Sequence, residues 1–275
     1  MPVFRGNVGN LLQHWVLCEI LAAWQSSANR VDFIDAYSMA PLADERPKRD
    51  PSARTFDYVQ RRLPGDETPY ERAWHALAPG DGHYPNSAAL LTVAWPGDYS
   101  LLLCESDPST VRQLREWGDD IAGEARCVGV EIAEGDWRNR FRQGLDASGD
   151  LTLLSFDPYL VNQRVSGRNP ANMDPRDMEL IAAAVRSVQR PIVIQLSTYS
   201  ANGGNPQPAV LDATDSRLEP AGFERLGVAR VDGHMMSMLY GRDLGEGPRL
   251  GDLPERFGVA PLLWTGQRYA VVASS

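Results

Sequence analysis

The chain has 275 residues, of which 43% are hydrophobic and 23% are charged, the composition of a globular domain with enough apolar material for a core. No apolar run reaches the roughly 18 residues that a membrane span needs, and the N-terminus lacks the pattern of an export signal. We therefore expect a cytoplasmic protein that does not contact a membrane. The three cysteines, Cys18, Cys104 and Cys127, are scattered and odd in number, which excludes a disulfide framework and offers no metal-ligand spacing.

The net charge is −9, with an isoelectric point near 5.0. Proteins that depend on contacts with phosphate groups usually have a net positive charge. A local cluster of arginines, such as Arg138, Arg140 and Arg142, is nevertheless a candidate for a phosphate-binding patch, because the guanidinium fork matches phosphate oxygens.

Hydrophobic periodicity and turn residues predict elements that alternate between helix and strand. In chain order these are a helix ending at Trp24, a strand at 31–35, a helix at 87–95, a strand at 99–104, a helix after Asp107, strands near 127–132 and at 151–156, a helix after Asp174, a strand at 192–197, a helix around 208–220, a hairpin of 223–231 and 235–240, and a last strand at 268–273. Such alternation predicts an α/β fold with a mostly parallel, doubly wound sheet. A closing antiparallel hairpin is typical of the class I methyltransferase variant of this Rossmann-like architecture.

Residues 42–82 interrupt the alternation. This segment is polar, contains five prolines and has aromatic side chains scattered through it, which does not fit a strand of the sheet. We interpret 42–82 as an inserted subdomain or lid within a single domain that spans residues 1–275.

Carboxylates follow four successive predicted strands. They are Asp35, Glu105, the pair Glu134 and Asp136, and Asp157. Ligands of open α/β sheets bind outside the carboxyl ends of the strands, so these side chains form an acidic edge suited to ribose hydroxyls, amino groups or a metal. Each carboxylate alone is equally well explained as a cap of the following helix, but four together are harder to explain in that way.

Asp157-Pro158-Tyr159 is the sharpest local motif. A proline directly after the aspartate directs one side-chain oxygen and one main-chain carbonyl to the same place, and these two acceptors suit an exocyclic amino group. The following aromatic ring can stack on a flat base. The alternative is a simple turn. The chain has neither a Walker phosphate loop nor a nucleophile elbow, and a nicotinamide dehydrogenase is not favoured because its glycine fingerprint is missing.

Seven short motifs lie in order along the chain: Gly6-Asn7-Val8-Gly9-Asn10-Leu11-Leu12-Gln13-His14, Phe33-Ile34-Asp35-Ala36-Tyr37-Ser38, Tyr84-Pro85-Asn86-Ser87, Cys104-Glu105-Ser106-Asp107-Pro108, Ala133-Glu134-Gly135, Phe156-Asp157-Pro158-Tyr159 and Gly233-His234-Met235. Together they resemble the S-adenosylmethionine-dependent adenine-N6 methyltransferases of 23S ribosomal RNA, the ribosomal large-subunit methyltransferase J family. The Asp-Pro-aromatic form is also similar to the three-Cys-motif partner proteins, a related methyltransferase-like group.

This resemblance implies S-adenosyl-L-methionine as the cofactor, with a pocket formed by Gln13, His14, Asp35, Ser87, Glu105, Glu134 and Gly135. Within it, Glu105 would hold the ribose and Glu134 would lie near the adenine. The resemblance further implies that Asp157 and the Pro158 carbonyl accept hydrogen bonds from the target amino group, while Tyr159 stacks on a flipped-out base. The implied partner is a nucleic acid, RNA rather than DNA.

Two features favour a second hypothesis. The resembled family has glycines after the first strand where this chain has Met39 and Pro41, and the chain is acidic. A protein of methyltransferase fold that has lost catalysis would serve as a binding or assembly module for a protein partner. Binding of the cofactor separates the two hypotheses.

Overall fold

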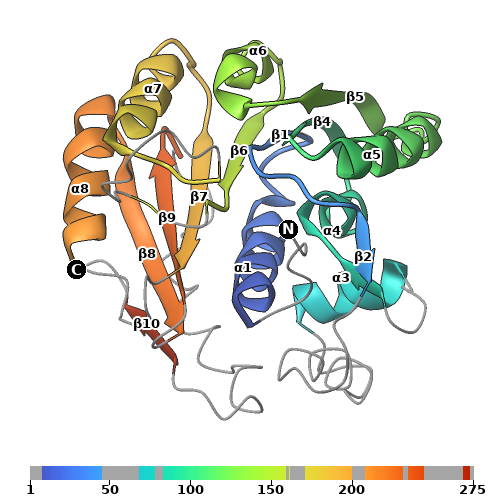
Figure 1. Cartoon of the computed structure of the whole chain (residues 1–275), viewed down its shortest axis with the longest axis horizontal. Coiled ribbons are helices and arrows are strands. Elements are labelled where there is room, and N and C mark those ends of the chain that lie inside the picture. The colour runs from blue at the N-terminus through green and yellow to red at the C-terminus, as the bar shows by residue number, and fades with distance from the viewer. Residues whose placement is uncertain are drawn as a thin grey trace.

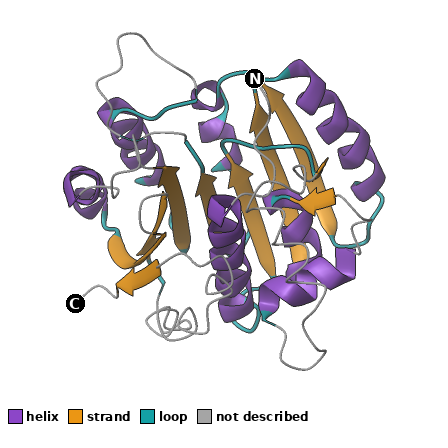
Figure 2. Cartoon of the chain, turned by 60° about the horizontal axis from the view of Figure 1, so that its bottom comes forward, coloured by secondary structure: helices purple, strands orange, loops and turns teal. Residues whose placement is uncertain are grey.

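A computed structural model describes residues 8–44, 68–77, 83–158, 161, 171–199, 208–231, 235–244 and 269–272. The main sheet has the strand order β10-β8-β9-β7-β6-β1-β4-β5, with helices packed around it (Figures 1 and 2). Its strands are β1 (Arg30–Asp35), β4 (Asp98–Glu105), β5 (Cys127–Glu134), β6 (Leu151–Phe156), β7 (Ile192–Tyr199), β8 (Glu224–Val231), β9 (Met235–Arg242) and β10 (Tyr269–Val272).

Five neighbouring strands, β5, β4, β1, β6 and β7, run parallel. Strand β9 is antiparallel to both β7 and β8, and β10 adds antiparallel to β8. The seven strands from β5 to β8, with β9 reversed, have the order and directions of a class I methyltransferase. The predicted fold class is therefore confirmed, including the antiparallel hairpin on the C-terminal side.

Helices cover both faces of the sheet because alternate strand residues point to opposite sides. In β1, Val31 and Phe33 belong to one apolar cluster and Ile34 to the other. The first cluster includes residues of α1 (Val8–Trp24), α4 (Ser87–Ala94) and α5 (Pro108–Ile121). The second includes residues of α6 (Phe141–Gly144), α7 (Pro175–Val185) and α8 (Pro208–Leu218). Among the helices that the structure describes, none is long and apolar enough to cross a membrane.

The described part of 42–82 lies against α1. Strand β2 (Leu42–Asp44) pairs antiparallel with β3 (His83–Pro85), and α3 (Pro69–Leu77) packs on α1 and α4. Aromatic rings join these elements: Trp74 lies 5.3 Å from Tyr84 between ring centroids. Residues 45–67 and 78–82 lie outside the described residues, so the interpretation of this segment as a subdomain or lid stays a prediction.

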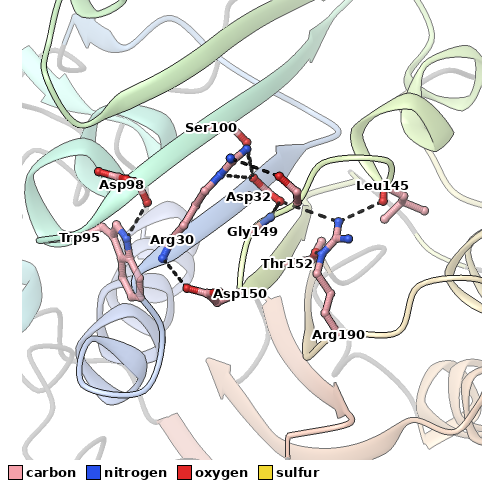
Figure 3. Close-up of polar contacts among 11 residues, drawn as sticks. Arg30, Asp32, Trp95, Asp98, Ser100, Leu145, Gly149, Asp150, Thr152 and Arg190 are labelled. Atoms are coloured by element: carbon pink, nitrogen blue, oxygen red, sulfur yellow. Dashed lines mark hydrogen bonds and ion pairs between the residues drawn. The ribbon is translucent and has the colours of Figure 1, made fainter.

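A polar cluster fastens the strands near their amino ends (Figure 3). The buried Asp32 carboxylate on β1 accepts hydrogen bonds from Arg30 (3.1 Å), from the Ser100 hydroxyl of β4 (2.5 Å) and from the backbone N–H of Gly149 (2.5 Å). A Cβ atom at Gly149 would lie 2.6 Å from an Asp32 oxygen, so only glycine allows this approach. The cluster joins β1, β4 and the residues before β6 at the end of the sheet opposite to the carboxyl edge.

Candidate cofactor and active site

A pocket lies at the carboxyl ends of β1 and β6. Its lining residues are Asn10, Gln13, His14, Asp35, Tyr37, Met39, Asn86, Ser87, Ala88 and Asp157. In the main sheet, β4 and β5, the next two strands along the chain, lie on one side of β1. Strand β6, which follows them in the chain, lies on the other side of β1. The pocket therefore lies at the point where the strand order reverses, which is where open α/β sheets bind their ligands.

Five residues predicted from the sequence meet in this pocket. They come from four separate segments: Gln13 and His14 from α1, Asp35 from the end of β1, Ser87 from the start of α4, and Asp157 from directly after β6. Pro158 follows as a buried residue, and Tyr159 lies outside the described residues. Residues up to 144 positions apart are thus brought to one place by the topology alone.

The two aspartates of the pocket are electrostatically coupled. Burial raises the pKa of Asp157 to about 8, and the nearby charge of Asp35 adds to this shift. Burial also raises the pKa of Asp35 to about 7; hydrogen bonds to this residue oppose the shift, and the charge of Glu105 adds to it. The Asp157 Oδ1 atom is buried and has no hydrogen-bond partner within the described part of the chain. A neutral, unpaired carboxyl at this position is suited to receive a hydrogen-bond donor.

Helix α1 brings two further polar side chains to the pocket. The Nδ1 atom of His14 lies 3.0 Å from the Tyr84 hydroxyl oxygen. Burial lowers the pKa of His14 to about 3, so the imidazole is neutral at physiological pH. The backbone carbonyl of Gln13 accepts a hydrogen bond from the Gln195 side chain (2.7 Å), whereas Gln13 Oε1 is buried without a partner among the described residues.

The loop after β1 is held in place by Asn86. The Asn86 side-chain amide donates a hydrogen bond to the Ala40 carbonyl, and its backbone N–H donates to the Pro41 carbonyl at 2.9 Å. Asn86 directly precedes α4, but its side chain makes no helix-capping hydrogen bond. It instead fixes the bulky loop that stands where the resembled family has glycines, and Met39 of this loop lines the pocket.

We expect Asn86→Asp to lower the free energy of unfolding by about 1–3 kcal/mol, because the carboxylate cannot donate to the Ala40 carbonyl. Urea denaturation measures this effect, and Asn86→Ala provides the comparison without a polar group. An aspartate variant as stable as the wild type would contradict the role of Asn86 as the fastening of this loop.

Glu105, Glu134 and Gly135 lie at the same edge of the sheet but do not line the pocket. One Glu105 carboxylate oxygen accepts backbone hydrogen bonds from Ser106 (2.6 Å) and Asp107 (2.7 Å). The Gly135 N–H donates to the Glu105 carbonyl at 2.8 Å, and Gly135 has a φ of 112°, which favours glycine. The Glu134 side chain is 50% exposed and pairs with Arg115 at 3.0 Å.

The sequence made Arg138, Arg140 and Arg142 a candidate phosphate-binding patch. This prediction is wrong for Arg138. The Arg138 side chain is only 5% exposed, and it pairs with Asp177 (2.5 Å) and Asp136 (2.9 Å). Two carboxylates already satisfy its guanidinium group, while Arg140 and Arg142 are exposed. Periodicity along the chain gave no indication of the pairing with Asp177, which lies 39 residues away.

Five lining residues were not singled out from the sequence as site residues. Two of them are Met39 and Ala88, and the other three are polar: Asn10, Tyr37 and Asn86. The Tyr37 hydroxyl accepts a hydrogen bond from the Trp137 indole at 3.1 Å, which places its ring beside the carboxyl edge of β5. All three belong to the short motifs that resemble the methyltransferase family, so their position within those motifs was the available signal. Across the described residues, no group of three or more His, Cys, Asp or Glu side chains is placed to hold a metal ion.

Comparison with solved structures identifies the fold. Protein LPL1258 from Legionella pneumophila, of the family DUF519, matches with a TM-score of 0.64 at 12% identity, covering 99% of each chain. The two chains share one fold. Two weaker similarities are to the candidate methyltransferase yhhF from Escherichia coli and to magnesium protoporphyrin IX methyltransferase from Synechocystis with S-adenosylmethionine bound. Their TM-scores are 0.42 and 0.40, their identities 12% and 8%, and they cover 89% and 84% of this chain and 92% and 81% of their own.

A comparison with protein-family models gives no match, and a search of the curated proteins gives none either. At 12% identity the structural match shows the fold alone. The function therefore has to be inferred from the residues of the pocket.

Proposed function

We propose that this protein is an S-adenosylmethionine-dependent methyltransferase that acts on an amino group, N6 of adenine in a nucleic acid, RNA rather than DNA. The observation that carries the proposal is the meeting of Gln13, His14, Asp35, Ser87 and Asp157 in one pocket at the switch point of the sheet. The sequence motifs selected these residues independently of any structure. Their arrangement fits the cofactor, because the pocket offers open acceptors and carboxyl groups to a ligand that carries cationic groups.

When bound, the cofactor supplies a methyl group activated by attachment to a positively charged sulfur. The residues of the chain then have to orient the acceptor. Asp157 and the Pro158 carbonyl accept hydrogen bonds from the two N–H groups of the target amine, so that the nitrogen lone pair faces the methyl group. A cationic cofactor favours the ionised form of Asp157, and in that form its raised pKa makes it a suitable acceptor for the proton that leaves the nitrogen after transfer. Alignment of this kind lowers the barrier through proximity and orientation.

Glu105 is proposed to bind the ribose. One of its carboxylate oxygens is occupied by the backbone N–H groups of Ser106 and Asp107, which fixes the orientation of the side chain and leaves the other oxygen for a hydroxyl group. We expect Glu105→Gln to weaken cofactor binding about tenfold, as loss of a charge-assisted hydrogen bond does. Calorimetric titration measures this affinity. Equal affinity of variant and wild type would place the ribose elsewhere.

The nucleic-acid target is supported by the Asp157-Pro158 geometry after β6 and by the family resemblance. The test is transfer of tritiated methyl groups to unmodified RNA and to unmodified DNA, followed by nucleoside analysis of the product. The proposal predicts N6-methyladenosine in RNA. Methylation of DNA alone would change the substrate, and binding of the cofactor without transfer to either would favour the second hypothesis of a binding module.

A further inference from the structure

Among the residues that the structure describes, the pocket has two acidic side chains and no positively charged side chain to balance them. Asp35 and Asp157 both line it, and within the described residues no lysine or arginine does. The His14 imidazole is neutral because burial lowers its pKa to about 3. No ion pair involves either aspartate in the described part of the chain. Asp35 is buried, and Asp157 is half-buried with its Oδ1 atom buried. Ionised carboxyl groups in such a place are costly without a counter-charge, and a positively charged ligand would supply one.

A second observation points to a ligand in the same place. Gln13 is 3% exposed, lines the pocket, and has a side-chain oxygen without a hydrogen-bond partner among the described residues. Buried polar atoms in native proteins are nearly always paired. Gln13 stands where the resembled family has a lysine, so this chain presents an acceptor in place of a cation. The pocket therefore combines an open acceptor on α1 with two carboxyl groups, one from Asp35 at the end of β1 and one from Asp157 directly after β6.

We infer that the Asp35–Asp157 pair makes this pocket selective for charge, so that it holds the sulfonium form of the cofactor and releases the neutral thioether product. This inference rests on the proposed function. S-adenosylmethionine and S-adenosylhomocysteine share the same adenosine and amino-acid groups. They differ by one methyl group and by the positive charge on sulfur, which is the charge that the carboxyl pair would face in the bound cofactor.

The transfer step removes that charge from the pocket. The bond between carbon and sulfur breaks, and both of its electrons stay on sulfur, which becomes a neutral thioether. The lone pair of the amine forms the new carbon–nitrogen bond, and the nitrogen then loses a proton. With the sulfonium gone, the two carboxylates repel each other, and one of them takes up this proton. The pair thus returns to a singly protonated form with one negative charge, as the product loses its electrostatic attraction.

The pH dependence follows from the groups that face the pair. Asp35 of β1 and Asp157 after β6 have pKa values raised to about 7 and about 8. From β4, the charge of Glu105 adds to the shift on Asp35. His14 of α1 remains neutral, and burial raises the pKa of Tyr37 further above the range of interest. Asn10, Gln13, Asn86 and Ser87 do not titrate.

Ionisation of the Asp35–Asp157 pair decides whether cofactor affinity rises or falls with pH. A cationic ligand favours the ionised carboxylates, so its binding below pH 7 has to displace protons, and its affinity rises with pH through 7–8 and then levels off. A neutral ligand gains nothing from ionisation. The affinity ratio of S-adenosylmethionine to S-adenosylhomocysteine is therefore expected to increase about tenfold between pH 6 and pH 9, since one coupled proton changes affinity tenfold per pH unit at most.

Calorimetric titration of the full chain tests this inference. The ligands are S-adenosylmethionine, S-adenosylhomocysteine and sinefungin, an analogue in which an amine-bearing carbon replaces the sulfonium. Each is titrated from pH 6 to pH 9 in buffers of different ionisation enthalpy, which reports the protons released. We expect the two cationic ligands to release protons near pH 7 and S-adenosylhomocysteine to release fewer. Asp157→Asn and Asp35→Asn should each reduce the affinity ratio about tenfold, whereas Asp119→Asn on the exposed side of α5 should leave it unchanged.

The outcomes separate this inference from the proposed function. Binding of all three ligands with one common pH dependence would overturn the charge selectivity and leave the cofactor site standing. Binding of none of them would overturn the proposed function and the inference together. If the ratio of S-adenosylmethionine affinity to S-adenosylhomocysteine affinity falls equally in Asp119→Asn, the net charge of the protein, and not the pair in the pocket, sets the preference for the cationic ligand. Because the pH series uses the wild-type protein, the test does not depend on the variants folding.

Discussion

Asp157→Ala is expected to reduce methyl transfer by about 10²–10³-fold, the cost of removing one group that orients or stabilises the reacting atoms. The side chain lies directly after β6 and lines the pocket with a buried oxygen that has no partner among the described residues. Its loss leaves the amino group held only by the Pro158 carbonyl. Single-turnover transfer of a tritiated methyl group at saturating cofactor measures the effect on the chemical step.

Cofactor affinity in the same variant should fall by no more than about tenfold, because the proposed site assigns the ribose and amino-acid groups of the cofactor to other residues. Asp157→Asn keeps the size of the side chain and one acceptor oxygen, so it should retain more activity than the alanine variant. Transfer at the wild-type rate in Asp157→Ala would refute the assignment of Asp157 to the reacting amine.

Asp32→Ala is expected to lower the free energy of unfolding by about 3–5 kcal/mol, as removal of one partner from a buried charge pair does. The Asp32 carboxylate accepts hydrogen bonds from Arg30, Ser100 and the Gly149 N–H, and it lies 3.8 Å from Arg190 (Figure 3). Without it, the N–H group of Gly149 and both arginines lose their shared acceptor. Urea denaturation with linear extrapolation measures the change.

Asp119→Ala, an exposed change of the same type on α5, should alter stability by less than about 0.5 kcal/mol. The Asp32 cluster lies near the amino ends of the strands, so the folded fraction of the Asp32 variant should still bind the cofactor. A loss below 1 kcal/mol would mean that the cluster does not hold the strands together.

The fold could be predicted because its signals are local. Buried strands such as 151–156 are mostly apolar. Asp107-Pro108 marks the start of a helix, where the Asp107 carboxylate indeed accepts a hydrogen bond from the Thr110 N–H at 2.9 Å. The strand order then follows from the rules of parallel sheets and a closing hairpin. Similar reasoning placed Asp35 and Asp157 at one edge, since each directly ends a parallel strand.

The details that depend on contacts between distant segments could not be predicted. The hydrogen bond between His14 and Tyr84 joins residues 70 positions apart, and the one between Asn86 and Ala40 joins residues 46 apart. An asparagine before a helix normally indicates a cap, whereas Asn86 fastens the loop after β1. Likewise, three arginines in alternate positions indicated a surface patch, but burial of Arg138 between Asp136 and Asp177 removes it from the surface.

A crystal structure of the protein grown with sinefungin would show whether the pocket at the carboxyl ends of β1 and β6 binds the cofactor. We expect ligand density bounded by His14, Ser87 and Asp157, with the amine of sinefungin facing the Asp35–Asp157 pair. Ligand bound at another part of the molecule, or an empty pocket at saturating ligand, would refute the assignment of this pocket as the cofactor site.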